Sequence, residues 1–108
     1  MPIFIKTEKF KNKTLKLSHD ERKKFISMHK EWVEDLSNSG HCIYSGYLIN
    51  EKKMPGSGGL LIIEAKDYLT AQKILENDPM IKNKLVTWEL QEWVIINGSK
   101  QQFYNHLG

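Results

Sequence analysis

Cysteine and long apolar runs are scarce in this sequence of 108 residues. The single cysteine, Cys42, cannot form a disulfide within the chain, so we expect a reducing compartment and interpret Cys42 as an inert thiol. No apolar run approaches the about 18 residues that a membrane-spanning helix needs. The opening "MPIFIKTEKF" lacks the cleavage site of a signal peptide. These absences predict one soluble, cytoplasmic domain with no membrane partner.

Metal-binding and cofactor-binding motifs are also missing. There is no CxxC motif, and the four histidines are scattered without helical pairing: His19, His29, His41 and His106. The "GSGG" at 56–59 lacks the preceding strand and following helix of a phosphate-binding loop, so we assign it to a hairpin turn. No nucleophile elbow or Ser/His/Asp signature stands in a recognisable context. We therefore expect no metal and no cofactor.

Positive charge is concentrated at the front of the chain. The formal net charge is +3, and the surplus of lysine and arginine falls within residues 1–30. Basic regions attract nucleic acid in some proteins, but no aromatic residues are interleaved here as in single-strand binders. We favour a solvated loop and helix face, and we expect no nucleic-acid partner.

The apolar patterns predict the element order β-α-β-β-α-β. Strands are expected over residues 2–6, 41–49, 60–65 and 85–96. The first helix follows Ser18, which forms a capping box with Glu21, and it carries an apolar stripe. The second helix follows Asp67 as its N-cap. Between these elements we expect an extended basic excursion over 7–17 and a hairpin loop over 50–59.

This order predicts an α+β, ferredoxin-like βαββαβ fold with a four-stranded antiparallel sheet and both helices on one face. The strand at 60–65 is apolar on both faces, so the other face of the sheet needs a cover. A second copy of the sheet is the simplest cover, which predicts a homodimer. We assign residues 1–97 to the domain and 98–108 to a tail that is either a short helix or disordered.

The residues most suited to chemistry are His29 and Asp78. His29 lies within the apolar stripe of the first helix, and Asp78 follows the second helix, which ends near the start of the first in this topology. A neutral imidazole oriented by a carboxylate is a general base near pH 7. Two other interpretations stay open: His29 as a core-border histidine, and Asp78 as the N-cap of a turn that begins at Pro79.

Most of the chain resembles the YciI-like (YCII-related domain) proteins. The resemblance rests on "MPIFIKTEKF", on the histidine in "SMHKEWVEDL", on "SGYLI" and on "GGLLIIEAKDYLTAQKILENDPMIKNKLVTWELQEW", and it covers residues 1 to about 96. It implies a dimeric ferredoxin-like α+β barrel, similar to muconolactone isomerases, with a His–Asp pair in a cleft that matches His29 and Asp78. Some relatives are linked to dechlorination of aromatic degradation intermediates. Many members have a basic residue one turn before the histidine, where this chain has Ile26; Arg22 lies farther up the helix.

Together these patterns predict a cofactor-independent enzyme of isomerase, lyase or dehalogenase type that acts on a small polar or aromatic molecule. We expect His29 to be the acid or base and Asp78 its partner, with substrate contacts from Arg22, Tyr44, Ser45, Gly46 and Trp88. The alternative is a dimer that binds a small ligand without transforming it, since a fold does not identify a reaction.

Overall fold

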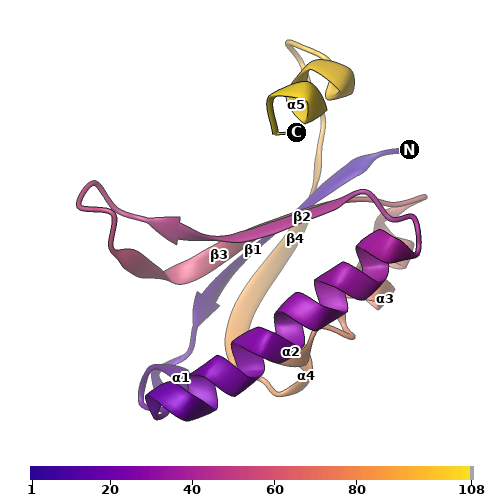
Figure 1. Ribbon diagram of the computed structural model, residues 1–108. Coiled ribbons are helices and arrows are strands. Elements are labelled where there is room, and N and C mark those ends of the chain that lie inside the picture. Colours follow the sequence, from indigo (N-terminus) through magenta and orange to yellow (C-terminus); the bar gives the residue numbers. More distant parts are fainter. Residues whose placement is uncertain (108) are drawn as a thin grey trace.

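A single antiparallel sheet organises the computed structural model, which describes residues 1–107. Its strands are β1 (Ile3–Phe10), β2 (Ile43–Ile49), β3 (Pro55–Glu64) and β4 (Val86–Trp93), in the order β2-β3-β1-β4. The two helices that the sequence predicts, α2 (His19–Asn38) and α3 (Tyr68–Leu75), pack against one face (Figure 1). The element order and strand order confirm the expected ferredoxin-like α+β class.

The helices begin and end at the predicted signals. The Ser18 side chain accepts a hydrogen bond from the Glu21 amide at 3.1 Å, and Asp67 accepts one from the Thr70 amide at 2.8 Å. Past the end of α2, Gly40 adopts a φ of +95°, which is costly for other residues. None of the helices in the described part of the chain is long and apolar enough to cross a membrane.

β1 and β3 are both longer than the apolar pattern predicts. β1 continues to Phe10, where an excursion was expected, and a short helix α1 (Asn12–Leu15) follows it. β3 begins at Pro55, inside the expected hairpin loop. Gly58 pairs with β1, and a Cβ at this position would lie 2.5 Å from the Glu8 carbonyl oxygen. Glycine therefore lets the two strands approach closely here, and this pairing overrides the local preference for a loop.

The main core lies between the helices and the sheet. Its buried members come from the sheet, from α3 and from the loop that joins them: Phe4, Ile43, Leu61, Ile63, Ala65, Ala71, Leu75 and Leu90. Trp32, Val33 and Leu36 of α2 pack against this cluster. Fully burying one large aliphatic or aromatic side chain contributes about 1.5–3 kcal/mol, so this layer holds α2 and α3 in place.

The tail forms helix α5 (Lys100–Leu107), which lies across the other face of the sheet from α2 (Figure 1). Phe103 meets Trp93 edge to face at a centroid distance of 5.1 Å, and Tyr104 stacks on Tyr44 at 5.8 Å. The C-terminal tail therefore covers part of the sheet face that we expected a second copy of the chain to cover. The sequence did not show this, because Tyr104 meets Tyr44 and Lys100 meets Glu64 across long stretches of the chain.

Polar groups of α5 also lie against the sheet. The Tyr104 hydroxyl is buried and has no hydrogen-bond partner among residues 1–107. Burial raises the pKa of this hydroxyl, and the nearby Cys42 and Glu64 raise it further. Lys100 Nζ lies 3.1 Å from Glu64 Oε1, and this hydrogen bond raises the pKa of Lys100.

Candidate active site

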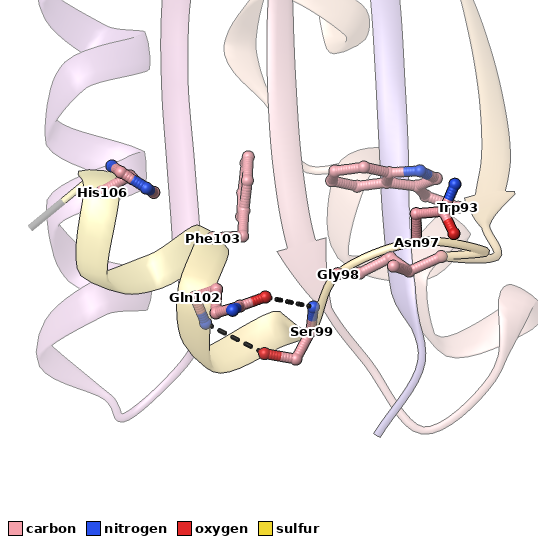
Figure 2. A pocket seen from close by; sticks show the side chains of 8 residues that line it. Trp93, Asn97, Gly98, Ser99, Gln102, Phe103 and His106 are labelled. Atoms are coloured by element: carbon pink, nitrogen blue, oxygen red, sulfur yellow. Dashed lines mark hydrogen bonds between the residues drawn. The ribbon is translucent and has the colours of Figure 1, made fainter.

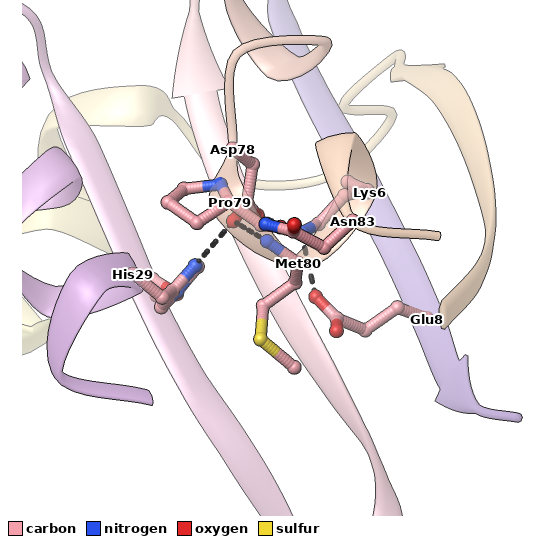
Figure 3. A network of polar contacts seen from close by, with 8 residues as sticks. Lys6, Glu8, His29, Asp78, Pro79, Met80 and Asn83 are labelled. Atoms are coloured by element: carbon pink, nitrogen blue, oxygen red, sulfur yellow. Dashed lines mark hydrogen bonds and ion pairs between the residues drawn. The ribbon is translucent and has the colours of Figure 1, made fainter. Parts of the chain in front are cut away.

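A polar network centred on Asp78 joins three parts of the fold (Figure 3). Asp78 is the N-cap of the short helix α4 (Pro79–Lys82), and His29 reaches it from α2. Lys6 reaches it from the middle of β1, the strand that lies under the helices. The network therefore depends on the folded arrangement, since 49 residues separate His29 from Asp78 in the chain.

Asp78 performs two structural roles with one carboxylate. Its Oδ1 accepts hydrogen bonds from the Met80 amide at 3.0 Å and from His29 Nδ1 at 2.9 Å. Its Oδ2 accepts from Lys6 Nζ at 3.1 Å, and its side chain is 0% exposed. Asp78 is thus the predicted N-cap of the turn that begins at Pro79, and it also contacts His29; the two interpretations hold together.

His29 is held between a buried carboxylate and a surface hydroxyl. Its Nδ1 donates to Asp78, because an ionised carboxylate only accepts, and its Nε2 then accepts from Ser45 Oγ at 2.9 Å. The side chain is 17% exposed, and its ring lies 5.8 Å from that of Trp32. The imidazole is therefore fixed in one tautomer with its lone pair on Nε2, on the side of the exposed Ser45.

Lys6 is a member of the network that the sequence reasoning missed. Its side chain is 0% exposed, and Nζ lies 2.6 Å from Glu8 Oε1 as well as 3.1 Å from Asp78 Oδ2. A buried ammonium needs such partners, because leaving it unpaired in the interior is costly. The available signal was strand alternation: Phe4 and Lys6 share one face, so a lysine stands where the pattern calls for a core residue.

These contacts decide the charge of Asp78. Burial by itself raises the pKa of this carboxyl, but the hydrogen bond from His29, the charge of Lys6 and the bond from the Met80 amide lower it by more. The net result is a pKa below the ordinary value of 3.8, so Asp78 is ionised at neutral pH. An ionised partner on Nδ1 stabilises the imidazolium form of His29, which is what a general base needs when it takes a proton.

The other predicted site residues are divided between the two faces of the sheet. Ser45 and Trp88 lie on the helix-covered face, where Trp88 packs against the core. Tyr44 and Gly46 alternate with Ser45 and therefore point to the opposite face, where Tyr44 stacks on Tyr104. They do not join His29 and Asp78. The space beside Gly46 is open, with no atom of the described residues within 4 Å of the position that a Cβ would take.

Among the hollows on the described part of the fold, two are relevant to the position of the site. A narrow one lies between α1, α2 and α4 and is lined by Phe10, Leu17, Arg22, Phe25, Ile26 and Met80. Arg22, Phe25 and Ile26 belong to the turns of α2 that precede His29, and Met80 follows Asp78 by two residues, so this hollow adjoins the polar network. In the residues that the structure describes, no three His, Cys, Asp or Glu side chains are grouped as a metal site.

The larger hollow, of about 330 Å³, lies at the tail (Figure 2). It is lined by Trp93, Ile95, Asn97, Gly98, Ser99, Gln102, Phe103 and His106. Ser99 and Gln102 bond to each other there as a cap for α5. None of the residues of the Asp78 network lines it, so we place the candidate site at the network and not at the larger hollow.

The fold and the network define a ferredoxin-like α+β domain with a buried carboxylate behind a histidine. The YCII-related domain family matches residues 3–93, so the chain belongs to this family, as the sequence resemblance indicated. No curated protein sequence matches the chain significantly.

Solved structures with the same fold include three proteins of low sequence identity. One is 5-chloro-2-hydroxyhydroquinone dehydrochlorinase (TftG) from Burkholderia phenoliruptrix AC1100 in complex with 2,5-dihydroxybenzoquinone, with TM-score 0.63, 22% identity, and coverage of 85% of this chain and 93% of that one. A protein of the ethd family from Bacillus halodurans has TM-score 0.53 and 10% identity, with 87% and 100% coverage. An antibiotic biosynthesis monooxygenase has TM-score 0.52 and 10% identity, with 88% and 99% coverage. At these identities the likeness shows the fold alone.

Proposed function

We propose that the chain is a small-molecule enzyme in which His29 exchanges a proton with the substrate and Asp78 orients the imidazole. The proposal is carried by the 2.9 Å contact between His29 Nδ1 and a carboxylate that is 0% exposed. Such a partner fixes the tautomer and stabilises the protonated ring, and general acid–base catalysis of this kind contributes about 10²–10⁴-fold in rate. No step of the proposed chemistry draws on a metal or a redox cofactor.

The substrate class we propose is a hydroxylated aromatic ring. One protein of similar fold is named a dehydrochlorinase of 5-chloro-2-hydroxyhydroquinone. A base that moves a proton from a ring hydroxyl to a ring carbon converts such a ring to a keto form. A halide on that carbon then leaves as an anion while a second ring hydroxyl gives its proton to the base, and the ring becomes a quinone. The same proton transfer without a leaving group is an isomerisation. Both reactions need the single acid–base group that His29 supplies.

Two further residues are proposed to contact the substrate. Arg22 lies on α2 two turns before His29, and its guanidinium is suited to an anionic group such as a phenolate. The narrow hollow that it lines has a volume of about 10 Å³, room for one water molecule, so we place the phenolate outside this hollow. Trp88, which lies on the same face of the sheet as Lys6, is suited to form an apolar wall. We do not extend this role to Tyr44 and Gly46, which point to the other face.

We propose that the chain works as a homodimer. The hairpin formed by β2 and β3 exposes four large apolar side chains: Tyr47 (72%), Leu48 (53%), Ile49 (52%) and Met54 (58%). Several large exposed apolar side chains on one hairpin are typical of protein interfaces. Sedimentation velocity tests the proposal, with dimer expected for the unsubstituted chain and monomer for Tyr47→Glu. A monomer at all concentrations of the unsubstituted chain contradicts it.

The catalytic proposal is tested with chlorinated and unchlorinated hydroxyhydroquinones, by chloride release and by ultraviolet absorbance. We expect His29→Gln to lower turnover by about 10²-fold or more. His19→Gln is the matched control, because the His19 side chain is 85% exposed and lies outside the network. Equal turnover in the two variants removes His29 from the mechanism. Binding of these compounds without any product favours the alternative, a ligand-binding dimer.

A further inference from the structure

Ser45, His29 and Asp78 form an unbroken hydrogen-bonded chain. Ser45 Oγ lies 2.9 Å from His29 Nε2, and His29 Nδ1 lies 2.9 Å from Asp78 Oδ1. Exposure falls along the chain, from the exposed Ser45 to the His29 side chain at 17% and the Asp78 side chain at 0%. A surface hydroxyl, an imidazole behind it and a buried carboxylate behind the imidazole are the nucleophile, base and orienting group of acyl transfer.

The charges around Asp78 set the direction of both hydrogen bonds. Lys6 Nζ at 3.1 Å and the Met80 amide at 3.0 Å keep the carboxylate ionised, so Asp78 accepts and His29 Nδ1 donates. The lone pair of the neutral ring is then on Nε2, and the Ser45 hydroxyl donates to it. This is the tautomer in which a histidine can take the proton of a serine.

The backbone at Ser45 offers a donor for an oxyanion. β2 is an edge strand, so half of its amides have no partner strand. The Glu64 amide donates to the Cys42 carbonyl at 3.0 Å, which places Cys42 in a hydrogen-bonded pair with β3. Ser45 stands three residues farther along, so antiparallel alternation turns its amide away from β3. That amide is a donor beside the hydroxyl oxygen.

One such donor limits the acyl groups that Ser45 can attack. Removing one donor from an oxyanion hole slows acyl transfer by about 10²–10³-fold. Ordinary amides and alkyl esters, with poor leaving groups, are therefore excluded in practice. Esters of phenols remain, because a phenolate is a much weaker base than an alkoxide and is therefore a better leaving group.

We propose that Ser45 is a nucleophile and that this protein has a second activity, the hydrolysis of aryl esters. As the Ser45 oxygen attacks the carbonyl carbon, His29 Nε2 takes its proton. The ester C–O bond then breaks, and the phenol leaves with the proton from His29. Water attacks the acyl group on Ser45 and gives its proton to His29, which returns it to the serine oxygen as the carboxylic acid is released.

This activity rests on the same His29–Asp78 pair as the proposed function, but the proton comes from a different atom. In the proposed function His29 takes a proton from the substrate, whereas here it takes one from Ser45. A covalent intermediate forms only in the second case. The presence or absence of that adduct therefore separates the two reactions.

The test treats the full chain with an alkyl fluorophosphonate, which phosphonylates an activated serine with loss of fluoride, and with p-nitrophenyl acetate. We expect one phosphonyl adduct per chain, mapped to Ser45 by peptide mass spectrometry, and none in Ser45→Ala. Ser39→Ala is the matched control, since the Ser39 hydroxyl bonds to the Asp35 carbonyl outside the network, and it keeps full labelling. His29→Gln slows the labelling of Ser45 by about 10²-fold or more.

The absence of an adduct, an adduct at another residue, or labelling that is as fast in His29→Gln as in the unsubstituted chain overturns the proposal. Circular dichroism shows whether each variant is folded. Labelling uses no aromatic diol, so turnover of hydroxyhydroquinones plays no part in its outcome. A protein that labels at Ser45 but leaves those compounds unchanged contradicts the proposed function alone.

Discussion

Asp78→Asn tests the electrostatic role of this aspartate separately from its capping role, and Asp67→Asn is the matched control. Both aspartates cap a helix, Asp78 through the Met80 amide at 3.0 Å and Asp67 through the Thr70 amide at 2.8 Å. Asparagine caps about as well as aspartate, so the substitution leaves both caps in place. Only Asp78 also faces a buried ammonium, that of Lys6. We therefore expect the loss of the negative charge to lower stability in Asp78→Asn but not in Asp67→Asn.

We expect Asp78→Asn to lower the free energy of unfolding by about 3 kcal/mol. Lys6 is 0% exposed and lies 3.1 Å from Asp78, and removing one partner of a buried ion pair costs about 3–5 kcal/mol. The lower end applies because Glu8, 2.6 Å from Lys6 Nζ, still neutralises the ammonium. In a domain of this size the loss corresponds to a decrease in Tm of roughly 15 °C. We expect Asp67→Asn to leave Tm nearly unchanged, since that side chain is exposed.

The pH dependence provides a second measurement on the same pair of variants. The pKa of Asp78 is below 3.8 in the folded state, so its contribution to stability is complete above pH 3.8 and is lost as pH falls through the folded pKa. The difference in stability between the unsubstituted protein and Asp78→Asn is therefore constant near neutral pH. It shrinks as the pH is lowered below 3.8.

Urea unfolding followed by far-ultraviolet circular dichroism measures these differences, provided that the m-values agree between variants. The reasoning is refuted if Asp78→Asn at pH 7 is no less stable than Asp67→Asn. That result would mean that Asp78 acts as a cap alone and that its contact with Lys6 carries no net free energy. A difference that persists undiminished in acid would equally contradict the assignment to the ionised carboxylate.

Three further substitutions test other parts of the structure. Lys6→Met leaves two carboxylates without a counter-charge, and we expect a loss of about 3 kcal/mol in urea unfolding; an unchanged midpoint contradicts the buried ion pair. The raised pKa of Tyr104 means that its contribution is complete below pH 10.0 and falls as the pH rises above that value. We expect Tyr104→Phe to lessen this alkaline decline, as followed by tryptophan fluorescence, and an identical profile would contradict it. A methyl group at Gly58 would lie 2.5 Å from a β1 carbonyl oxygen whereas one at Gly46 meets nothing within 4 Å, so we expect a lower Tm for Gly58→Ala than for Gly46→Ala.

Local chemistry made much of the fold and part of the site predictable. The capping box at Ser18, the cap at Asp67 and the glycine after α2 are settled by groups a few residues apart, so the sequence alone determines them. The same holds for the pairing of Asp78 with Pro79 at the start of α4. Apolar periodicity determined which face of α2 meets the sheet, and it therefore placed His29 on that face.

Contacts between residues far apart in the sequence determined the features of the fold and the site that local signals did not predict. The residues next to Lys6 in the sequence do not indicate that it pairs with Asp78, because 72 residues separate the two. Only the packing of β1 under α4 brings their charges together. The bond from Ser45 to His29 and the covering of the sheet by α5 likewise join distant residues. The glycines near residue 58 favour a loop by local preference alone, but pairing with β1 stabilises them as part of β3. The sequence by itself thus determined helices α2 and α3 and the residue types available for chemistry. Only the tertiary structure decided which of those residues meet, because their contacts depend on the whole chain being folded.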